Sequence, residues 1–236
     1  MTPTSRDYLT QIASDVERIA GLLEAAPDDR TASPVPACPE WDVHAVVKHL
    51  GGVHRMVTNA VRTGQPSHSS RFWPDGDEPL IPWFAAGAQG LLAALDTDTS
   101  TPAWSFDPTG GTVGWWQRRQ TMETLVHRID VEQALDSPSP IDPAIADDGV
   151  AEVLDTMVRL RVNAGELQLP DDAIELRATD TGDSWLLGIG DVRGVAEGTA
   201  EALLTSLWKR SVPTAGLCLT GDAAAVAAML GQSLTP

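Results

Sequence analysis

The sequence predicts an α+β protein in which a four-helix bundle precedes a small α/β domain. Three observations predict this arrangement. Apolar stripes with helical period fill the first half of the 236-residue chain. Strand-like runs joined by turn residues appear only in the second half. A segment with three prolines, residues 136–146, separates the two textures. We therefore predict a helical domain over 1–140 and an α/β domain over 147–236.

The helical half contains four stretches of helical character. In the first, Tyr8, Ile12 and Ile19 lie near one stripe, as expected for an amphipathic helix. A proline-rich loop over 26–40 follows, and Asp42 is a typical N-cap for the second helix. The predicted helices cover residues 8–23, 43–61, 80–95 and 114–135. Four helices of this length favour a bundle.

The second half alternates helices and strands. Its clearest feature is a predicted hairpin, in which the runs 173–179 and 184–190 are joined by DTGD, a turn sequence. A helix over 198–210 ends before Pro213, which cannot continue it. The other predicted elements are a helix over 148–162, a strand over 216–221 and a helix over 222–230.

Composition and charge exclude several classes of function. The net charge is −17, from 33 acidic and 16 basic residues, which argues against a nucleic-acid partner because phosphates would be repelled. The longest uncharged run, 80–95, is shorter than the roughly 18 residues of a membrane span. The first residues lack the pattern of a signal peptide, and Cys38 and Cys218 are far apart without CxxC spacing. We therefore expect a cytoplasmic protein with no membrane partner and no disulfide.

The stretch ETLVHRID, residues 123–130, places three polar side chains on one narrow helix face. With Met122 at zero, Glu123 lies at about 100°, His127 at about 140° and Asp130 at about 80°. A first-row metal ion needs nitrogen and oxygen donors from one side, and i,i+4 spacing supplies two. The alternative is a surface ion pair, which i,i+4 spacing also favours. From this helix alone, the ion pair is the commoner outcome.

A third metal ligand would have to come from the second helix, which carries His44, His49 and His54. Their spacing of five residues turns each about 140° from the previous one, so the three cannot reach one site. His44 lies on the polar side, where it is expected to be solvated. His49 and His54 both lie on or beside the apolar side. Geometry leaves both as candidates, and a core histidine is the alternative for either one.

Two blocks of sequence resemble the mycothiol-dependent maleylpyruvate isomerase family. They are CPEWDVHAVVKHLGGVH and FDPTGGTVGWWQRRQTMETLVHRIDVEQAL. The second half resembles that family's second domain in GDSWLLGIG, GTAEALLTSLWKR and LCLTGDAAAVAAML. The resemblance covers nearly the whole chain. It implies a DinB-like four-helix metal-binding domain followed by a small α/β domain of the sterol-carrier type.

Position by position, the resemblance implies a metal site of His49, Glu123 and His127. Two histidines and one glutamate leave a fourth position open to water or substrate, as catalytic zinc sites require. We therefore expect a divalent cation, in the first place Zn²⁺. Mycothiol is the implied thiol cosubstrate, and a small molecule is the implied substrate.

The resemblance implies a maleylpyruvate cis–trans isomerase in which a thiolate adds to the double bond. Arg210 is expected to hold a substrate carboxylate, for which its planar fork is suited. Asp130 is expected to orient His127 or a nearby arginine, or to lie on the helix surface. Trp41, Trp115 and Trp116 are candidates for the wall of the thiol pocket, with core packing as the alternative. Of these three, we predict Trp41 and Trp116 as cofactor-binding residues.

The chain departs from the family pattern at two positions. Glu40 precedes Trp41 where the family commonly has glycine, and Lys209 precedes Arg210 where the family commonly has a small residue. These changes bear on the substrate more than on the metal. Three alternative functions therefore stand beside the isomerase: a mycothiol S-transferase, a metal-dependent hydrolase, and a non-catalytic metal-binding or ligand-binding protein.

Overall fold

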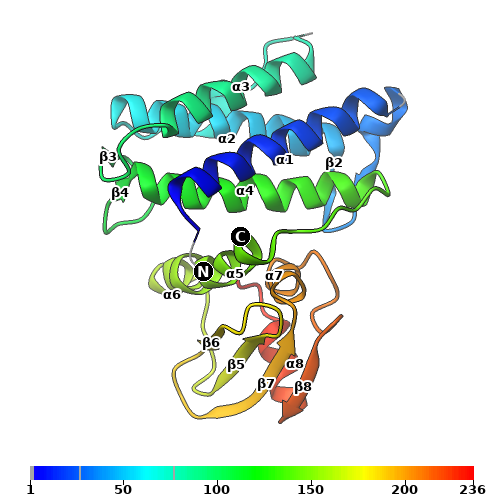
Figure 1. The fold of residues 1–236 in the computed structure, drawn as a ribbon, viewed down its shortest axis with the longest axis vertical. Coiled ribbons are helices and arrows are strands. Elements are labelled where there is room, and N and C mark those ends of the chain that lie inside the picture. The colour runs from blue at the N-terminus through cyan, green and yellow to red at the C-terminus, as the bar shows by residue number, and fades with distance from the viewer. Residues whose placement is uncertain (1–2, 27, 77) are drawn as a thin grey trace. The chain divides into compact units, whose positions relative to one another are not determined.

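A computed structural model describes residues 3–26, 28–76 and 78–236 of the chain. The chain forms two compact units (Figure 1). One unit spans Thr4–Ser139, and the other contains Pro140–Pro236 together with Pro3. The predicted fold class is confirmed, because the N-terminal region is helical and the C-terminal region contains a sheet.

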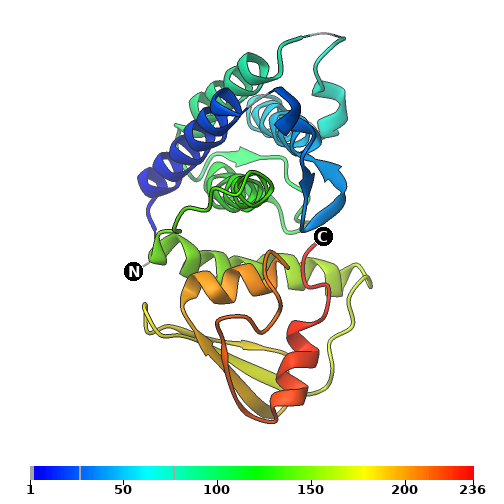
Figure 2. The same ribbon diagram turned by 90° about the vertical axis from the view of Figure 1, so that its right-hand side faces the viewer.

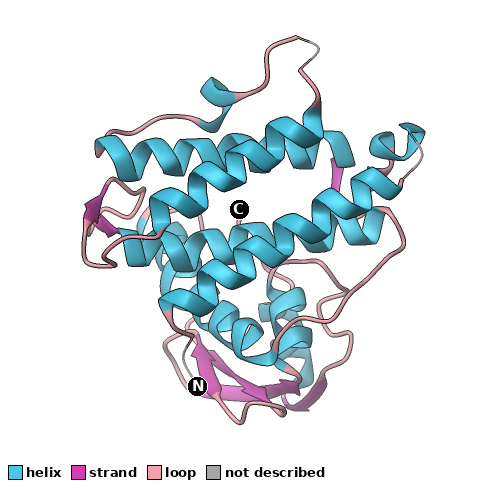
Figure 3. Cartoon of the chain, turned by 45° about the horizontal axis from the view of Figure 1, so that its top comes forward, coloured by secondary structure: helices cyan, strands magenta, loops and turns pink. Residues whose placement is uncertain are grey.

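The first unit is built from four long helices. They are α1 (Ser5–Ala25), α2 (Val43–Thr63), α3 (Leu80–Leu95) and α4 (Val113–Ala134). Helix α2 packs most extensively against α3, and α1 packs most extensively against α4. Figure 3 shows these helices with short strands, short helical turns and loops between them. Their shared core includes the fully buried Ile12, Leu50, Phe84, Leu91 and Trp116.

Side chains at the helix ends explain where these helices begin. Thr4 and Asp7 form a reciprocal capping box at the start of α1. Asp42 accepts a hydrogen bond from the Ala45 N–H at 2.7 Å, which confirms it as the N-cap of α2. Thr112 caps α4 in the same way, accepting from the Trp115 N–H at 3.2 Å. These caps set the registers of α2 and α4, the two helices that carry the candidate metal ligands.

A glycine on α2 allows α3 to approach closely. A Cβ atom added to Gly51 would lie 2.3 Å from the ring of Trp83, closer than any real contact. Only glycine therefore fits there without moving the tryptophan. This explains the first glycine of the HLGG stretch, residues 49–52, which begins with His49.

The loops of the first unit hold short elements that the sequence did not predict. Strands β1 (Pro34–Val35) and β2 (Cys38–Asp42) pair antiparallel, and both begin inside the predicted proline-rich loop. Strand β3 (Pro102–Ala103) pairs antiparallel with β4 (Gly111–Thr112). Two short 3₁₀ helices are also present, η1 (Asp28–Ala32) and η2 (Ser69–Phe72). Residue 27 of the predicted loop lies outside the described residues.

The second unit contains a four-stranded sheet with the order β6-β5-β7-β8. Strand β5 pairs antiparallel with β6 and parallel with β7, and β8 pairs antiparallel with β7. Figure 2 shows α7 and α8 beside this sheet, in agreement with their contacts to β5, β7 and β8. The strands are β5 (Ala173–Ala178), β6 (Ser184–Leu187), β7 (Val192–Gly198) and β8 (Cys218–Gly221). The helical elements are α5 (Pro143–Glu152), the π-helical turn η3 (Val153–Val158), α6 (Arg159–Asn163), α7 (Ala200–Leu207) and α8 (Ala223–Leu230).

Two features of the second unit correct the sequence prediction. Strand β7 was not predicted, because VRGVAEG contains two glycines and few large apolar residues, yet it forms a central strand of the sheet. Helix α5 begins at Pro143, inside the stretch interpreted as a linker. Asp142 accepts a hydrogen bond from the Ala144 N–H at 2.9 Å and caps this helix. Proline is favoured at the first position of a helix, so Pro143 is compatible with a helix that begins there.

Within the described residues, no helix combines the length and the apolar character needed to cross a membrane. Cys38 and Cys218 form no disulfide.

Candidate metal centre

Helices α2 and α4 bring together three side chains with metal-binding donors. His49 comes from α2, and Glu123 and His127 come from α4. The donor atoms of the three all lie within 4.8 Å of one another. Glu123 Oε1 lies 3.2 Å from His49 Nε2 and 3.4 Å from His127 Nε2. We call His49, Glu123 and His127 the triad. Among the described residues it is the one group of this kind.

Helix geometry left His49 and His54 as alternatives for the third metal ligand, and the structure distinguishes between them. His54 is fully buried, its Nε2 lies 3.2 Å from Thr124 Oγ1, and its ring stacks on Phe84 at 5.6 Å. Burial lowers the pKa of His54 to about 3, so this histidine is neutral at physiological pH. It is a core histidine, and His49 is the one that faces Glu123. His44 is exposed, as predicted.

Asp130 holds His127 from behind. Its Oδ2 lies 2.9 Å from His127 Nδ1, and Asp130 has no exposed surface. The contact presents the other ring nitrogen, Nε2, to the triad. Carboxylate–histidine pairs of this kind orient metal-binding histidines in known sites. The alternative of a helix-surface role for Asp130 is therefore wrong.

Arg119 holds the carboxylate of Glu123, and the sequence analysis did not identify it. Its guanidinium donates a hydrogen bond to Glu123 Oε2 at 2.9 Å, and its side chain is only 3% exposed. The two carboxylate oxygens of Glu123 therefore have different partners. Oε2 accepts a hydrogen bond from the Arg119 guanidinium, and Oε1 faces the two imidazoles. The i−4 spacing of Arg119 from Glu123 was the available signal.

The electrostatics of the triad suit a cation. Burial would raise the pKa of Glu123, but hydrogen bonds from His127 and His49 outweigh it and hold that pKa well below its usual range. Burial would likewise lower the pKa of His127, but its contacts with Asp130 and Glu123 raise it to about 9. The carboxylates of Glu123 and Asp130 therefore stabilise a positive charge at the triad. In the absence of a metal that charge is a proton on His127, and a bound divalent cation would replace the proton.

The two predicted tryptophans have different surroundings. The half-buried ring of Trp41 lies 4.9 Å from the ring of His49 and 6.0 Å from that of His127, centroid to centroid. Trp41 therefore forms a wall beside the triad. Trp116 has no exposed surface, and its Nε1 donates to the Trp104 carbonyl at 2.6 Å. The side chain of Trp116 therefore packs in the core of the first unit, as the alternative interpretation expected, and its role in cofactor binding stays a prediction.

Arg210 lies in the second unit, after α7. Its guanidinium donates to the Trp208 carbonyl at 2.8 Å and lies 5.9 Å from the Trp208 ring centre. Lys209, one of the two departures from the family pattern, has a φ of 58°, in the left-handed region. Glycine adopts this conformation without strain, which explains a small residue in the family at this position. Glu40, the other departure, is exposed.

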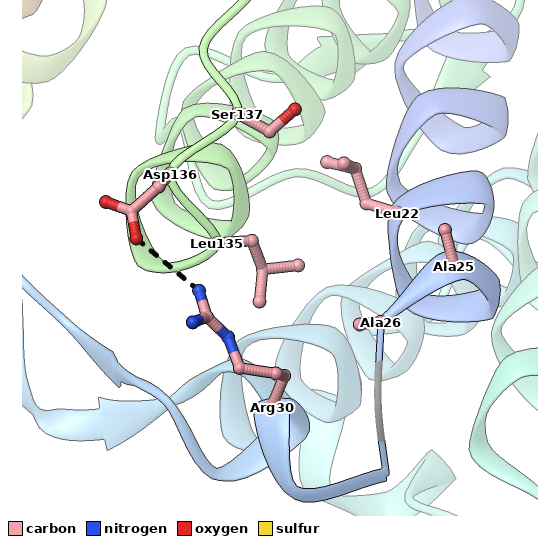
Figure 4. A pocket seen from close by; sticks show the side chains of 7 residues that line it. All are labelled: Leu22, Ala25, Ala26, Arg30, Leu135, Asp136 and Ser137. Atoms are coloured by element: carbon pink, nitrogen blue, oxygen red, sulfur yellow. Dashed lines mark ion pairs between the residues drawn. The ribbon is translucent and has the colours of Figure 1, made fainter.

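A surface hollow of about 490 Å³ lies elsewhere in the first unit, at the C-terminal ends of α1 and α4 (Figure 4). Arg30 reaches Asp136 across it, with an N–O distance of 3.5 Å. Asp136 is 88% exposed in its side chain, so the pair contributes little stability. The hollow shares no residue with the triad and carries none of the predicted site residues.

Comparisons with known proteins agree with this arrangement. Residues 13–132 match the family model described as the mycothiol maleylpyruvate isomerase N-terminal domain. Two solved structures share the fold, a histidine-to-alanine mutant of the mycothiol-dependent maleylpyruvate isomerase (TM-score 0.70) and a second structure under that enzyme's name (TM-score 0.67). Each is 12% identical to this chain, and each alignment covers 93% of this chain and 95% of the other. No curated protein sequence matches significantly. Because the family model spans just over half of the chain and includes the whole triad, the chain belongs to the mycothiol maleylpyruvate isomerase family.

Proposed function

We propose that this protein is a metal-dependent enzyme that uses the low-molecular-weight thiol mycothiol, of the maleylpyruvate cis–trans isomerase type. One observation carries the proposal. Two imidazoles and one carboxylate converge within 4.8 Å, in a chain that belongs to this family.

His49, Glu123 and His127 would hold the cation. Two nitrogens and one oxygen are a donor set that zinc accepts, and three protein ligands leave one coordination position open. Zn²⁺ is the best fit, and the same donors suit other divalent first-row metals. When bound, the cation would keep the thiol deprotonated at neutral pH, where a free thiol is mostly protonated.

The protein's own residues would orient the reactants. Asp130 would keep His127 Nε2 directed at the triad, and Arg119 would hold Glu123. The ring of Trp41 would provide an apolar wall for the thiol and keep water from it. Arg210 would bind a carboxylate of the substrate, since a guanidinium pairs with a carboxylate through two hydrogen bonds.

The reaction itself needs no oxidant and no co-reactant besides the thiol. A sulfur–carbon bond forms at one carbon of the cis double bond, and the electron pair moves onto the conjugated carbonyl. Rotation about the resulting single bond follows. The sulfur–carbon bond then breaks, the double bond re-forms as trans, and the thiol is regenerated. This accounts for a thiol that is required and not consumed.

Elemental analysis of the protein purified without chelator tests the metal. We expect about one divalent ion per chain, and its loss in His127→Ala. His44→Ala is the matched control, because His44 is exposed on the same helix as His49 and lies outside the triad. Wild-type protein that holds no metal and takes up none when zinc is added would refute the proposal.

An assay on maleylpyruvate, with and without mycothiol, tests the reaction. Isomerisation that requires mycothiol supports the proposal. Thiol transfer to another electrophile would instead identify an S-transferase, and turnover without any thiol would identify a hydrolase. A metal-loaded protein that turns over none of these substrates would be a binding protein.

A further inference from the structure

Another surface hollow of the first unit lies between α2, η2 and α3, on a face of α2 turned away from the triad. Helices α2 and α3 pack side by side (Figure 1). The hollow has a volume of about 300 Å³, which is enough for a small molecule. We call it the α2–α3 pocket, and its lining includes Arg55, Asn59, Arg62, Phe72, Gly87 and Gly90.

The pocket is separate from the candidate metal centre. At 100° per residue, Arg55 and Arg62 lie about 240° and about 220° around α2 from His49. The pocket and the triad accordingly have no residue in common. A ligand in the pocket would therefore not depend on a metal at the triad.

Neutral groups hold the guanidinium of Arg55 in the pocket. It donates to the Gly51 carbonyl at 3.1 Å and to the Trp83 carbonyl at 2.5 Å, and it lies 4.1 Å from the centre of the Trp83 ring. A Cβ atom added to Gly87 would lie 2.2 Å from Arg55 Nη1, so glycine provides the space that the guanidinium fills. The two carbonyls use two of the five N–H donors of an arginine. A guanidinium held in this way is suited to bind an oxyanion.

The positive charges of the pocket have no paired carboxylate. Within the described part of the chain, neither Arg55 nor Arg62 forms an ion pair, and no acidic residue belongs to the lining. Burial lowers the pKa of Arg55, and the charge of Glu78 offsets this only in part. Arginine nevertheless stays protonated at physiological pH. A partly buried charge without a counter-ion favours an anionic ligand, because Coulomb interactions are less screened there than in water.

The sequence around the pocket points the same way. Residues 43–74, which include α2 and η2, contain none of the 33 acidic residues of the chain, and α3 contains none either. The basic residues in 43–74 are Lys48, Arg55, Arg62 and Arg71. Asp75 and Glu78 follow, but both are exposed and lie outside the lining. In a chain with a net charge of −17, this local excess of positive charge would attract anions.

We propose that the α2–α3 pocket binds a small organic anion, a carboxylate or a phosphate attached to an apolar group. Arg55 and Arg62 bind the oxyanion. The half-buried ring of Phe72 contacts the apolar part. This inference goes beyond the proposed function, because it requires neither the metal nor the thiol.

Calorimetric titration of the full chain tests the site with probes of matched size. Benzoate and phenyl phosphate are the anionic probes, and benzyl alcohol is the neutral one. We expect both anions to bind, and benzyl alcohol to bind about tenfold more weakly or less, because it cannot form a charged hydrogen bond with arginine. The tighter anion identifies the head group. Absence of binding by either anion at millimolar concentration, or equal binding of benzyl alcohol, would overturn the inference.

Charge-removing variants test the two arginines. Arg55→Gln should bind the tighter anion about tenfold more weakly, and Arg62→Gln about threefold more weakly because Arg62 is exposed. Arg6→Gln is the matched control, since it removes the same charge from an exposed position on α1 outside the pocket. An equal loss in Arg6→Gln and Arg62→Gln would mean that net charge alone attracts the anion, which would overturn the inference.

A variant that fills the pocket keeps both arginines. A Cβ atom at Gly90 would meet no atom closer than Thr58 Oγ1 at 3.9 Å, and leucine favours a helix more than glycine does, so Gly90→Leu should fold. It should lose anion binding, whereas Glu123→Gln should bind the anion as wild type does. Unchanged binding in Gly90→Leu, or loss in Glu123→Gln, would place the anion elsewhere and overturn the inference. Failure of the proposed function would leave these outcomes unchanged, because none of them requires a metal.

Discussion

Helix α4 carries two buried charged clusters with different partners. The first is the triad with Arg119 and Asp130, directed toward α2. The second is directed toward α1, where Arg128 bonds Asp15 at 2.8 Å and Arg18 bonds Glu132 at 2.9 Å. We call Asp15, Arg18, Arg128 and Glu132 the α1–α4 network.

The two clusters differ in how the charges are matched. In the α1–α4 network each carboxylate has an arginine of its own, and Asp15 and Glu132 are almost completely buried. In the triad, three donor atoms converge on one place, and the side chains of His49 and Glu123 are 29% and 19% exposed. Buried charge alone therefore does not indicate a site. Donors that converge beside an accessible surface do, because a ligand can still reach them.

The sharpest test of this comparison exchanges one carboxylate in each cluster for its amide. Glu123→Gln removes the anionic ligand of the triad and should weaken zinc binding by more than the roughly 100-fold that a supporting residue contributes. Asp15→Asn, the matched control, should keep the metal content of the wild type. Zinc titrations with a competing chelator measure both. Tight zinc binding by Glu123→Gln would remove the distinction between the clusters.

The α1–α4 network should instead show itself in the pH dependence of stability. Burial raises the pKa of Asp15 to about 6, despite its pairing with Arg128. The stability that this group contributes is therefore full below its unfolded pKa near 3.8 and is lost as the pH rises through about 6. Between about pH 4.5 and about pH 7.5 wild type should lose about 2 kcal/mol relative to Asp15→Asn.

Urea unfolding of both proteins at the two pH values gives this difference directly. Parallel pH profiles for wild type and Asp15→Asn would show that Asp15 titrates with an ordinary pKa.

A substitution of Asp130 tests whether its contact with His127 strengthens metal binding at the triad. Asp130→Asn keeps the shape of the side chain but removes the charge that lies 2.9 Å from His127 Nδ1. Loss of such a partner typically weakens metal affinity by about 10- to 100-fold. We expect an effect in this range, smaller than that of Glu123→Gln, in the same zinc titration. An unchanged affinity would assign Asp130 to folding alone.

Lys209 gives the smallest expected effect and concerns the second unit. Its left-handed backbone strains any residue with a Cβ, and its ammonium group donates to the Leu230 carbonyl. Lys209→Ala loses the hydrogen bond and keeps the strain, whereas Lys209→Gly loses both. The glycine variant should therefore be more stable than the alanine variant, by about 1 kcal/mol. Thermal unfolding compares the two, and a more stable alanine variant would contradict the explanation from backbone strain.

Local patterns predicted much of the fold. The four helices of the first unit and the hairpin of β5 and β6 follow from periodicity, caps and turn residues, which act over a few positions. Strand β7 was not predicted from the sequence, because its two glycines and small side chains give it little intrinsic strand propensity. It is a strand because β5 and β8 pair with it on either side.

For the candidate site, the sequence by itself determined that Glu123 and His127 share one face of a helix, since that follows from the helical repeat alone. Tertiary structure decided the rest. It directed His49 at Glu123 and placed His54 against Phe84 and Thr124. It also brought Trp41 beside the triad and buried Trp116 in the core. The physical reason is that the angle of a side chain around its own helix is a local property, whereas its neighbour depends on how two helices distant in sequence pack together.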